Sequence, residues 1–208
     1  LAFVKIRGIR REREILISSV RMTLQLILTG YVLVYLFDNE SWILTLLVLT
    51  IMEIFAINNI YKRVNVKISN RLKKIIAISM VTGTVTCLLY FIIIVIGLRP
   101  WFSPRYFIPI SGMLIGNSMT GISLGVNRLV NDMNKQKHLV ESSLMLGATP
   151  KIAAKEIVDS AFDSAIMPTI NSMVGMGIVF LPGMMTGQIL SGISPVTAIE
   201  YQIAIMLG

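Results

Sequence analysis

Five long apolar stretches run through the sequence, and they restrict its fold more than any other feature. Each is close to or above the roughly 20 residues that a helix needs to cross the hydrocarbon core of a bilayer. Because a chain in lipid must satisfy its backbone polar groups internally, such stretches form helices. The sequence therefore predicts an all-α fold, a polytopic bundle of transmembrane helices. The predicted spans cover residues 15–37, 42–60, 75–98, 106–129 and 165–190.

The composition excludes an ordinary water-soluble globule. Of the 208 residues, 54% are hydrophobic and 14% are charged, whereas roughly a quarter are charged in a soluble domain. The single cysteine, Cys87, lies within an apolar run. No disulfide framework can form, and Cys87 is interpreted as a small buried hydrophobe. The bilayer is therefore the first partner predicted for this chain.

Both ends of the sequence resemble cut helices. Leu1 leads directly into a basic stretch, as the end of a preceding span would. At the other end, a further apolar stretch starts at Ser194-Pro195, where serine can cap a helix and proline can occupy its first turn. Residues 195–208 are nevertheless too few to cross a membrane. We therefore expect residues 1–208 to form a single transmembrane domain that is truncated at both ends.

The basic residues are segregated along the chain. Three segments hold 16 of the 19 lysines and arginines, whereas the loops between these segments contain only Arg99 and Arg105. The basic segments precede the first span, follow the second and follow the fourth. By the positive-inside rule they lie in the cytoplasm, so the chain is predicted to be a multi-pass protein of the inner or plasma membrane. Topology thus accounts for the net charge of +8, and we expect no nucleic-acid partner.

One hydrophilic insertion, residues 130–164, separates the fourth and fifth spans. An apolar stripe on a predicted helix ends there at Gly147, a suitable C-terminal cap, and Thr149-Pro150 can start a second helix. This amphipathic helix pair is predicted to face the cytosol. Two interpretations stay open, namely helices that lie on the lipid surface and a helix that docks in a groove of a cytosolic partner.

Two ionisable residues are predicted at membrane depth, where a charge needs a partner or a function. Arg21 and Glu53 lie at similar depth in adjacent antiparallel spans. We expect a structural ion pair between them, with Arg21 reaching toward the cytosol; a substrate or cation site is the alternative. Other polar residues at this depth, which could line a path or bond between helices, are Gln25, Asn117, Asn171 and Gln188.

Pro182 and Gly183 form an unusual dipeptide for the middle of a span. Pro182 cannot donate to the carbonyl of Ile178, so the helix is predicted to kink or break there and to leave backbone oxygens for another donor or a cation. Broken helices near the middle of a membrane recur in the binding sites of transporters. A packing kink is an equal alternative.

Three Gly-x-x-x-Gly pairs predict close helix packing, either within the bundle or at a dimer face. They are Gly112 with Gly116, Gly121 with Gly125, and Gly183 with Gly187.

Patterns typical of catalysis are weak here. Residues Gly121 to Gly125 match the G-x-S-x-G pattern, but the only histidine, His138, lies in the predicted insertion, and no strand-to-helix elbow is predicted. The sequence contains no G-x-x-x-x-G-K-[ST] phosphate loop and no Cys/His cluster with metal-ligand spacing. We therefore expect no enzyme activity and no cofactor bound by this chain. Any ATP hydrolysis would come from another chain.

Three strings carry a family resemblance. Glu-Ser-Ser-Leu-Met-Leu-Gly-Ala-Thr-Pro begins at Glu141, Ile-Met-Pro-Thr-Ile-Asn-Ser-Met at Ile166, and Leu-Pro-Gly-Met-Met-Thr-Gly-Gln at Leu181. With them the chain resembles the FetB-like family of ABC transporter permeases. That family is described as metal exporters, especially of iron, with plant relatives linked to aluminium tolerance. The resemblance is dense from about Tyr106 to the end of the sequence, and before that it rests on one short string and on hydropathy.

The resemblance implies a permease homodimer served by a separate ABC ATP-binding subunit, which would carry ATP and magnesium. It also implies that the helix pair couples to this subunit, because the string from Glu141 looks like the start of the coupling motif of ABC importers. Ser142 and Ser143 replace the alanines of that motif, and its later Ile-x-Leu-Pro is missing, so the detailed geometry is not carried over. The implied coupling residues are Glu141, Leu144, Gly147, Ala148, Thr149, Pro150 and Lys151.

The resemblance further implies export of a metal ion such as iron, with ligands that stay unknown. An organic or sugar-nucleotide substrate is an alternative, as are a passive channel and a membrane scaffold or sensor that transports nothing. The residues that we expect along the substrate path are Glu53, Asn171, Met184, Met185 and Gln188.

Overall fold

The computed structural model describes residues 12–64 and 68–207, and helices joined by short turns make up this part of the chain. It contains no β-strand, only an isolated bridge between Met176 and Phe180. The predicted all-α fold is confirmed. The helices are α2 (Glu12–Asp38), α3 (Trp42–Arg63), α4 (Asn70–Tyr90), the π-helix η1 (Phe91–Ile96), α5 (Pro104–Lys135), α6 (Lys137–Met145), α7 (Pro150–Ala153), α8 (Lys155–Gly175), α9 (Gly183–Leu190) and α10 (Pro195–Leu207).

Four helical segments of the described residues are long and apolar enough to cross a membrane. They overlap the first four predicted spans closely, because each apolar run is helical over nearly its whole length. They are Arg13–Asp38, Trp42–Arg63, Asn70–Ile96 and Pro104–Lys135.

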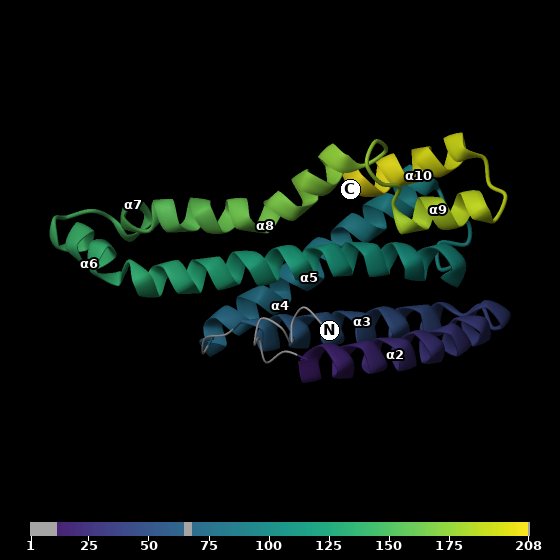
Figure 1. Cartoon of the computed structure of the whole chain (residues 1–208), viewed down its shortest axis with the longest axis horizontal. Coiled ribbons are helices and arrows are strands. Elements are labelled where there is room, and N and C mark those ends of the chain that lie inside the picture. Colours follow the sequence, from purple (N-terminus) through teal and green to yellow (C-terminus); the bar gives the residue numbers. More distant parts are fainter. Residues whose placement is uncertain (1–11, 65–67, 208) are drawn as a thin grey trace.

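α5 is the central helix of the fold. It begins with proline in its first turn, and its 32 residues extend about 48 Å at 1.5 Å per residue. Figure 1 shows α5 side by side with α8, and with α3 on its other side. Two buried apolar clusters flank it. The first consists of Leu88, Phe91, Ile92, Phe107, Ile110 and Ile205, and the second of Ala56, Ile60, Ile76, Met80 and Ile115.

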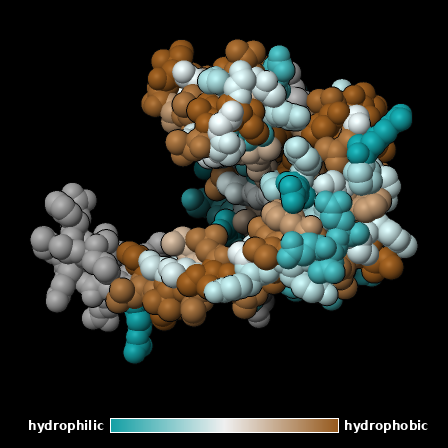
Figure 2. All heavy atoms as spheres, turned by 90° about the vertical axis from the view of Figure 1, so that its right-hand side faces the viewer, coloured by the Kyte–Doolittle hydropathy of each residue, from teal (hydrophilic) through white to brown (hydrophobic). Residues whose placement is uncertain are grey.

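α2 packs least tightly against the rest of the bundle. Its side chains are exposed from Arg13 to Tyr31, and Leu36 near its end is buried. Close to that end, the guanidinium carbon of Arg105 lies 5.7 Å from the centre of the Phe37 ring. Figure 2 shows hydrophobic side chains over much of the visible surface, with smaller hydrophilic areas between them. In a bilayer such a surface lies against lipid, which favours its apolar side chains.

The fifth predicted span, residues 165–190, is not one helix. α8 ends at Gly175, and the eight-residue α9 begins only after Pro182. The turn between them satisfies part of its own backbone, because Gly177, with a left-handed φ of 84°, donates to the carbonyl of Phe180 at 2.9 Å. The break therefore starts ahead of Pro182 and is wider than the missing N–H of proline alone predicts.

The predicted insertion, residues 130–164, contains the ends of two long helices as well as two short helices between them. α5 continues to Lys135, and α8 begins at Lys155. These helices run antiparallel and are joined at one end by α6 and α7, which Figure 1 shows at the far end of the molecule from α9 and α10. We call α6, α7 and the residues between them, 137–153, the hairpin tip. The α5–α8 hairpin thus carries two short helices at its end.

Candidate functional site

A cavity of about 310 Å³ lies between α5, α8 and α10. A second cavity of about 490 Å³ adjoins it on the side of α4, and the two share Asn117, Gly121, Ala165, Thr169 and Met206. We call the two together the chamber. The smaller cavity is lined by Met113, Asn117, Thr120, Gly121, Ala165, Pro168, Thr169, Ser172, Met176, Phe180, Pro182, Gln202 and Met206.

Close helix packing builds one wall of the chamber. A Cβ atom added to Gly121 would lie 3.0 Å from the carbonyl oxygen of Ala165, and one added to Gly125 would lie 3.1 Å from the Ala165 Cβ. Larger side chains at either glycine would force α5 and α8 apart. The Gly121 and Gly125 pair therefore packs within the chain, against a small residue of α8, as small-residue motifs in membranes do.

The polar groups of the chamber are neutral. None of the residues that line either cavity carries a formal charge. The hydroxyls of Thr120 and Ser172 donate to the carbonyls of Gly116 and Pro168 in their own helices. Their lone pairs remain as hydrogen-bond acceptors.

Gln202 of α10 is a buried polar residue of the smaller cavity. Its side chain lines the smaller cavity and only 5% of the residue is exposed. Neither Oε1 nor Nε2 has a hydrogen-bond partner. Since buried amides are nearly always bonded in folded proteins, an unpartnered one in a cavity wall is a candidate ligand contact.

Apolar and sulfur-containing side chains complete the lining. Met113, Met176 and Met206 face the smaller cavity, and Met173 and Cys87 line the larger one. Thioethers are soft and adaptable, so they fit ligands of varied shape.

The five residues expected along the substrate path are not gathered in one place. None of them lines either cavity of the chamber. Glu53 is buried between α3 and α4, where its Oε1 accepts a hydrogen bond from the Thr84 hydroxyl and its Oε2 has no partner. Thr84 itself lines the larger cavity, so Glu53 lies behind the chamber wall.

The other path candidates lie on α8 and α9. Asn171 is exposed, Met185 is buried, and Met184 packs against the cluster around Phe91. Gln188 is half-buried, and its Oε1 has no partner. The polar residues that line the smaller cavity are Asn117, Thr120, Thr169, Ser172 and Gln202, and the role of the five expected residues in a substrate path stays a prediction.

The expected ion pair between Arg21 and Glu53 is absent from the described residues, in which the ion pairs lie elsewhere. Arg21 places its guanidinium carbon 5.9 Å from the centre of the Phe55 ring. Glu53 instead faces α4 and Thr84. In place of the ion pair, Arg21 makes a cation–π contact with Phe55, and Glu53 accepts a hydrogen bond from the Thr84 hydroxyl.

The hairpin tip gathers all the predicted coupling residues, from Glu141 to Lys151. Gly147, with a φ of 90°, turns the chain between the two short helices, and the Thr149 hydroxyl accepts from the Ile152 N–H at 3.4 Å to cap α7. Glu141 lies 3.6 Å from Lys137 in an exposed pair. The tip is thus a locally ordered turn.

Apolar side chains cover the hairpin tip. Met145 and Leu146 are 88% and 89% exposed, and Leu139, Leu144 and Ile152 are exposed as well. Adjacent exposed apolar residues of this kind mark surfaces that contact a partner or a membrane.

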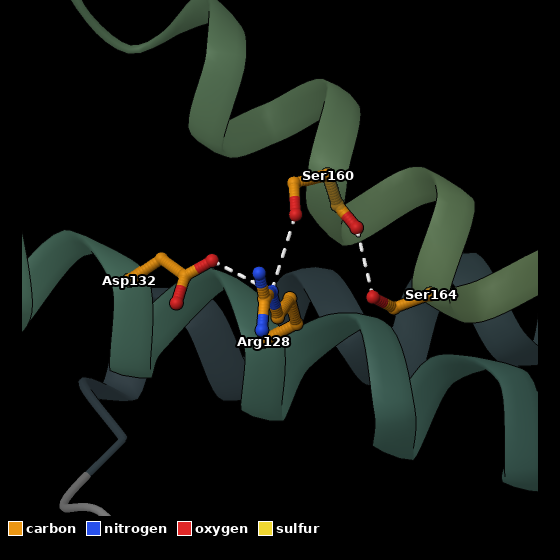
Figure 3. A network of polar contacts seen from close by, with 4 residues as sticks. All are labelled: Arg128, Asp132, Ser160 and Ser164. Carbon is orange, nitrogen blue, oxygen red and sulfur yellow. Dashed lines mark hydrogen bonds and ion pairs between the residues drawn. The ribbon is translucent and has the colours of Figure 1, made fainter.

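A polar network ties the two arms of the hairpin together (Figure 3). The Arg128 Nε of α5 lies 2.7 Å from Oδ2 of the buried Asp132 and 3.1 Å from the Ser160 hydroxyl of α8. The Ser164 hydroxyl donates to the Ser160 carbonyl at 2.8 Å, which completes the network within α8.

Clusters of the usual metal ligands are absent from the part of the chain that the structure describes. No group of three or more histidine, cysteine, aspartate or glutamate side chains is placed to hold a metal ion there. A metal bound in the chamber would therefore contact amide, hydroxyl or thioether groups, or the thiol of Cys87.

The spans and the chamber define a polytopic α-helical membrane protein. The chain belongs to the family described as "Uncharacterised protein family (UPF0014)", whose model matches residues 1–208. No solved structure matches this chain.

Three relatives show how this family is distributed. The UPF0014 membrane protein YjkA of Bacillus subtilis is 36% identical over 195 residues, covering 94% of this chain and 76% of the relative. The "Probable iron export permease protein FetB" of Escherichia coli is 36% identical, covering 93% and 73%. The plant "Protein ALUMINUM SENSITIVE 3" of Arabidopsis thaliana is 35% identical, covering 94% and 70%. The similarity extends over nearly all of this chain in each case.

Proposed function

We propose that this chain is the membrane-spanning permease subunit of an ATP-driven exporter whose cargo is a metal such as iron. The observation that carries the proposal is the exposed apolar hairpin tip, in which Met145 and Leu146 are almost fully exposed. Similarity to a relative named as an iron export permease supports both the transport role and the cargo.

The distribution of charge supports a cytoplasmic position for the hairpin tip. Lys135, Lys137, Lys151 and Lys155 lie at or beside it. Arg99 precedes α5 and Arg105 lies in its first turn, at the other end of that long helix. By the positive-inside rule the tip faces the cytoplasm of a cell whose inner or plasma membrane holds the protein.

A separate ATP-binding subunit is the partner that fits the tip. The sequence contains no phosphate-binding loop, so ATP and magnesium bind on that other chain. An amphipathic helix can enter an apolar groove of a partner, and α6 offers Leu139, Leu144 and Met145 for this contact. Two permease chains with two ATP-binding subunits complete the transporter.

The hairpin provides a mechanical link between the tip and the chamber. α5 and α8 run from the tip to the chamber wall at Gly121 and Ala165, and Arg128 holds the two helices together on the way. Movement of the tip by an ATP-driven partner would therefore tilt both helices and change access to the chamber.

Transport into inside-out vesicles tests this proposal. The vesicles contain the full-length permease with its ATP-binding subunit, and uptake of radioactive iron is measured with ATP and with a non-hydrolysable analogue. Iron uptake is expected with ATP and not with the non-hydrolysable analogue. Association of the two subunits without any ATP-dependent flux would indicate a scaffold or sensor, and flux that needs no ATP would indicate a channel.

A further inference from the structure

The chamber restricts the form in which cargo can be bound, and this inference rests on the proposed export of metal. Gln202 lines the smaller cavity, the residue is 95% buried, and neither its acceptor Oε1 nor its donor Nε2 has a hydrogen-bond partner. A bare cation can satisfy the oxygen but repels the hydrogens on the nitrogen. An occupant that completes this amide must both donate and accept hydrogen bonds.

The remaining polar groups of the wall point to the same kind of occupant. Thr120 and Ser172 use their hydroxyl hydrogens within their own helices and keep lone pairs for an incoming donor. Asn117 and Thr169 add a further amide and hydroxyl, and both border the two cavities.

Charge is the second restriction. The lining of the chamber carries no formal charge, and Glu53 is separated from it by Thr84, which takes up one of its oxygens. A multivalent cation that left water for this site would lose hydration without gaining a counter-charge, which is strongly unfavourable.

We propose that the chamber binds metal as an electrically neutral complex, in which oxygen ligands from the cargo itself balance the charge of the ion. The outer N–H groups of such a complex, and the lone pairs left on its ligand oxygens, would pair with Gln202, Thr120 and Ser172. Its apolar edges would contact Met113 and Met206. The two adjoining cavities, of about 310 and 490 Å³, fall in the size range of sites that hold drug-sized ligands.

Equilibrium binding to the full-length permease in lipid nanodiscs, without the ATP-binding subunit, tests this inference. The probe is tris(acetohydroxamato)iron(III), a neutral complex with outer N–H donors and oxygen acceptors. Two comparisons are metal-free acetohydroxamic acid and Fe²⁺ under anaerobic conditions. We expect the complex to bind at least tenfold more tightly than either.

Matched variants assign the binding to the chamber. Gln202→Leu should weaken binding of the complex at least tenfold. Gln188→Leu alters a half-buried glutamine outside the chamber lining and should leave binding unchanged. Gln202→Glu introduces a counter-charge and should shift the preference toward Fe²⁺. If Gln202→Leu does not fold, Thr169→Val provides a second chamber variant, and it should also weaken binding of the complex.

Three results would overturn the inference: Fe²⁺ binding as tightly as the complex, metal-free ligand binding as tightly, or wild-type affinity in Gln202→Leu. Because no ATP-binding subunit is present, these results leave ATP-driven export open. Conversely, the permease could bind the complex selectively and yet show no ATP-dependent uptake of iron in any form. That result would contradict the proposed export function and would leave the binding preference intact.

Discussion

The Arg128 Nε–H donates to the Ser160 hydroxyl at 3.1 Å and thereby joins the two long arms of the hairpin. The same nitrogen lies 2.7 Å from the carboxylate of Asp132, whose side chain is 8% exposed. This contact lies between the exposed tip and the chamber. It holds α5 and α8 together there, so that a movement of the tip can reach the chamber.

Arg128→Leu should lower the stability of the protein by about 1 kcal/mol, because it leaves the buried Asp132 carboxylate without its charged partner while Arg128 itself is half exposed. The thermal unfolding midpoint in detergent measures this loss. Lys137→Gln is the matched control, since it removes another i,i+4 pair that is exposed on both sides. Equal shifts for the two variants would show that the Arg128 network has no special structural role.

Gly125→Leu should separate α5 from α8, because a Cβ there already lies 3.1 Å from the Ala165 Cβ and 3.2 Å from the Ala161 carbonyl. Overpacking of this kind costs about 1–3 kcal/mol and should lower the unfolding midpoint. Gly116→Leu, on the same helix, meets no atom within 4 Å at its Cβ and should be tolerated. A reversed order of the two midpoints would contradict the packing described here.

Thr84→Val should destabilise the protein by about 1–3 kcal/mol, because the buried Glu53 carboxyl loses its hydrogen-bond partner. Thr84→Ser keeps the hydroxyl and should restore most of the midpoint. Thr82→Val removes a similar hydroxyl that bonds within the same helix at an exposed position, so it should change little. Equal destabilisation by the two valine variants would argue that Thr84 contributes only its own helical bond.

The sequence predicts the helices of this protein better than it predicts their contacts. Apolar length alone places α2 to α5, because a chain in lipid has few alternatives to a helix. The same signal joins residues 165–190 into one span, although Gly175 and Gly177 interrupt it. Hydropathy does not register the left-handed turn at Gly177, where the backbone bonds across to Phe180.

Pairing between polar residues depends on helix rotation, which hydropathy does not determine. Arg21 and Glu53 match in depth, but they face Phe55 and Thr84 respectively. Asn117 was identified from its depth in the membrane and does line the chamber. Gln202 gave no separate signal in the sequence, because its place in the cavity wall follows from how α10 packs against α9 and η1. Its amide side chain directly precedes the apolar run that ends α10, and this contrast is the sign that could have drawn attention to it.

Leu146→Asp should reduce co-purification of the ATP-binding subunit at least tenfold, because it places a charge in the centre of the proposed contact surface. Leu190→Asp provides the matched control, since Leu190 is 83% exposed at the end of α9, far from the tip (Figure 1). Amounts of both subunits after affinity purification measure the effect. Undiminished association in Leu146→Asp would place the ATPase contact elsewhere.

The side of the membrane on which the hairpin tip lies is the most direct test of this account. Leu146→Cys in a background without Cys87 gives a reactive thiol at a position that is 89% exposed, and a membrane-impermeant maleimide reports its location. The account predicts labelling in inside-out vesicles and none in intact cells. Labelling in intact cells would put the tip outside, where no ATP-driven partner could reach it.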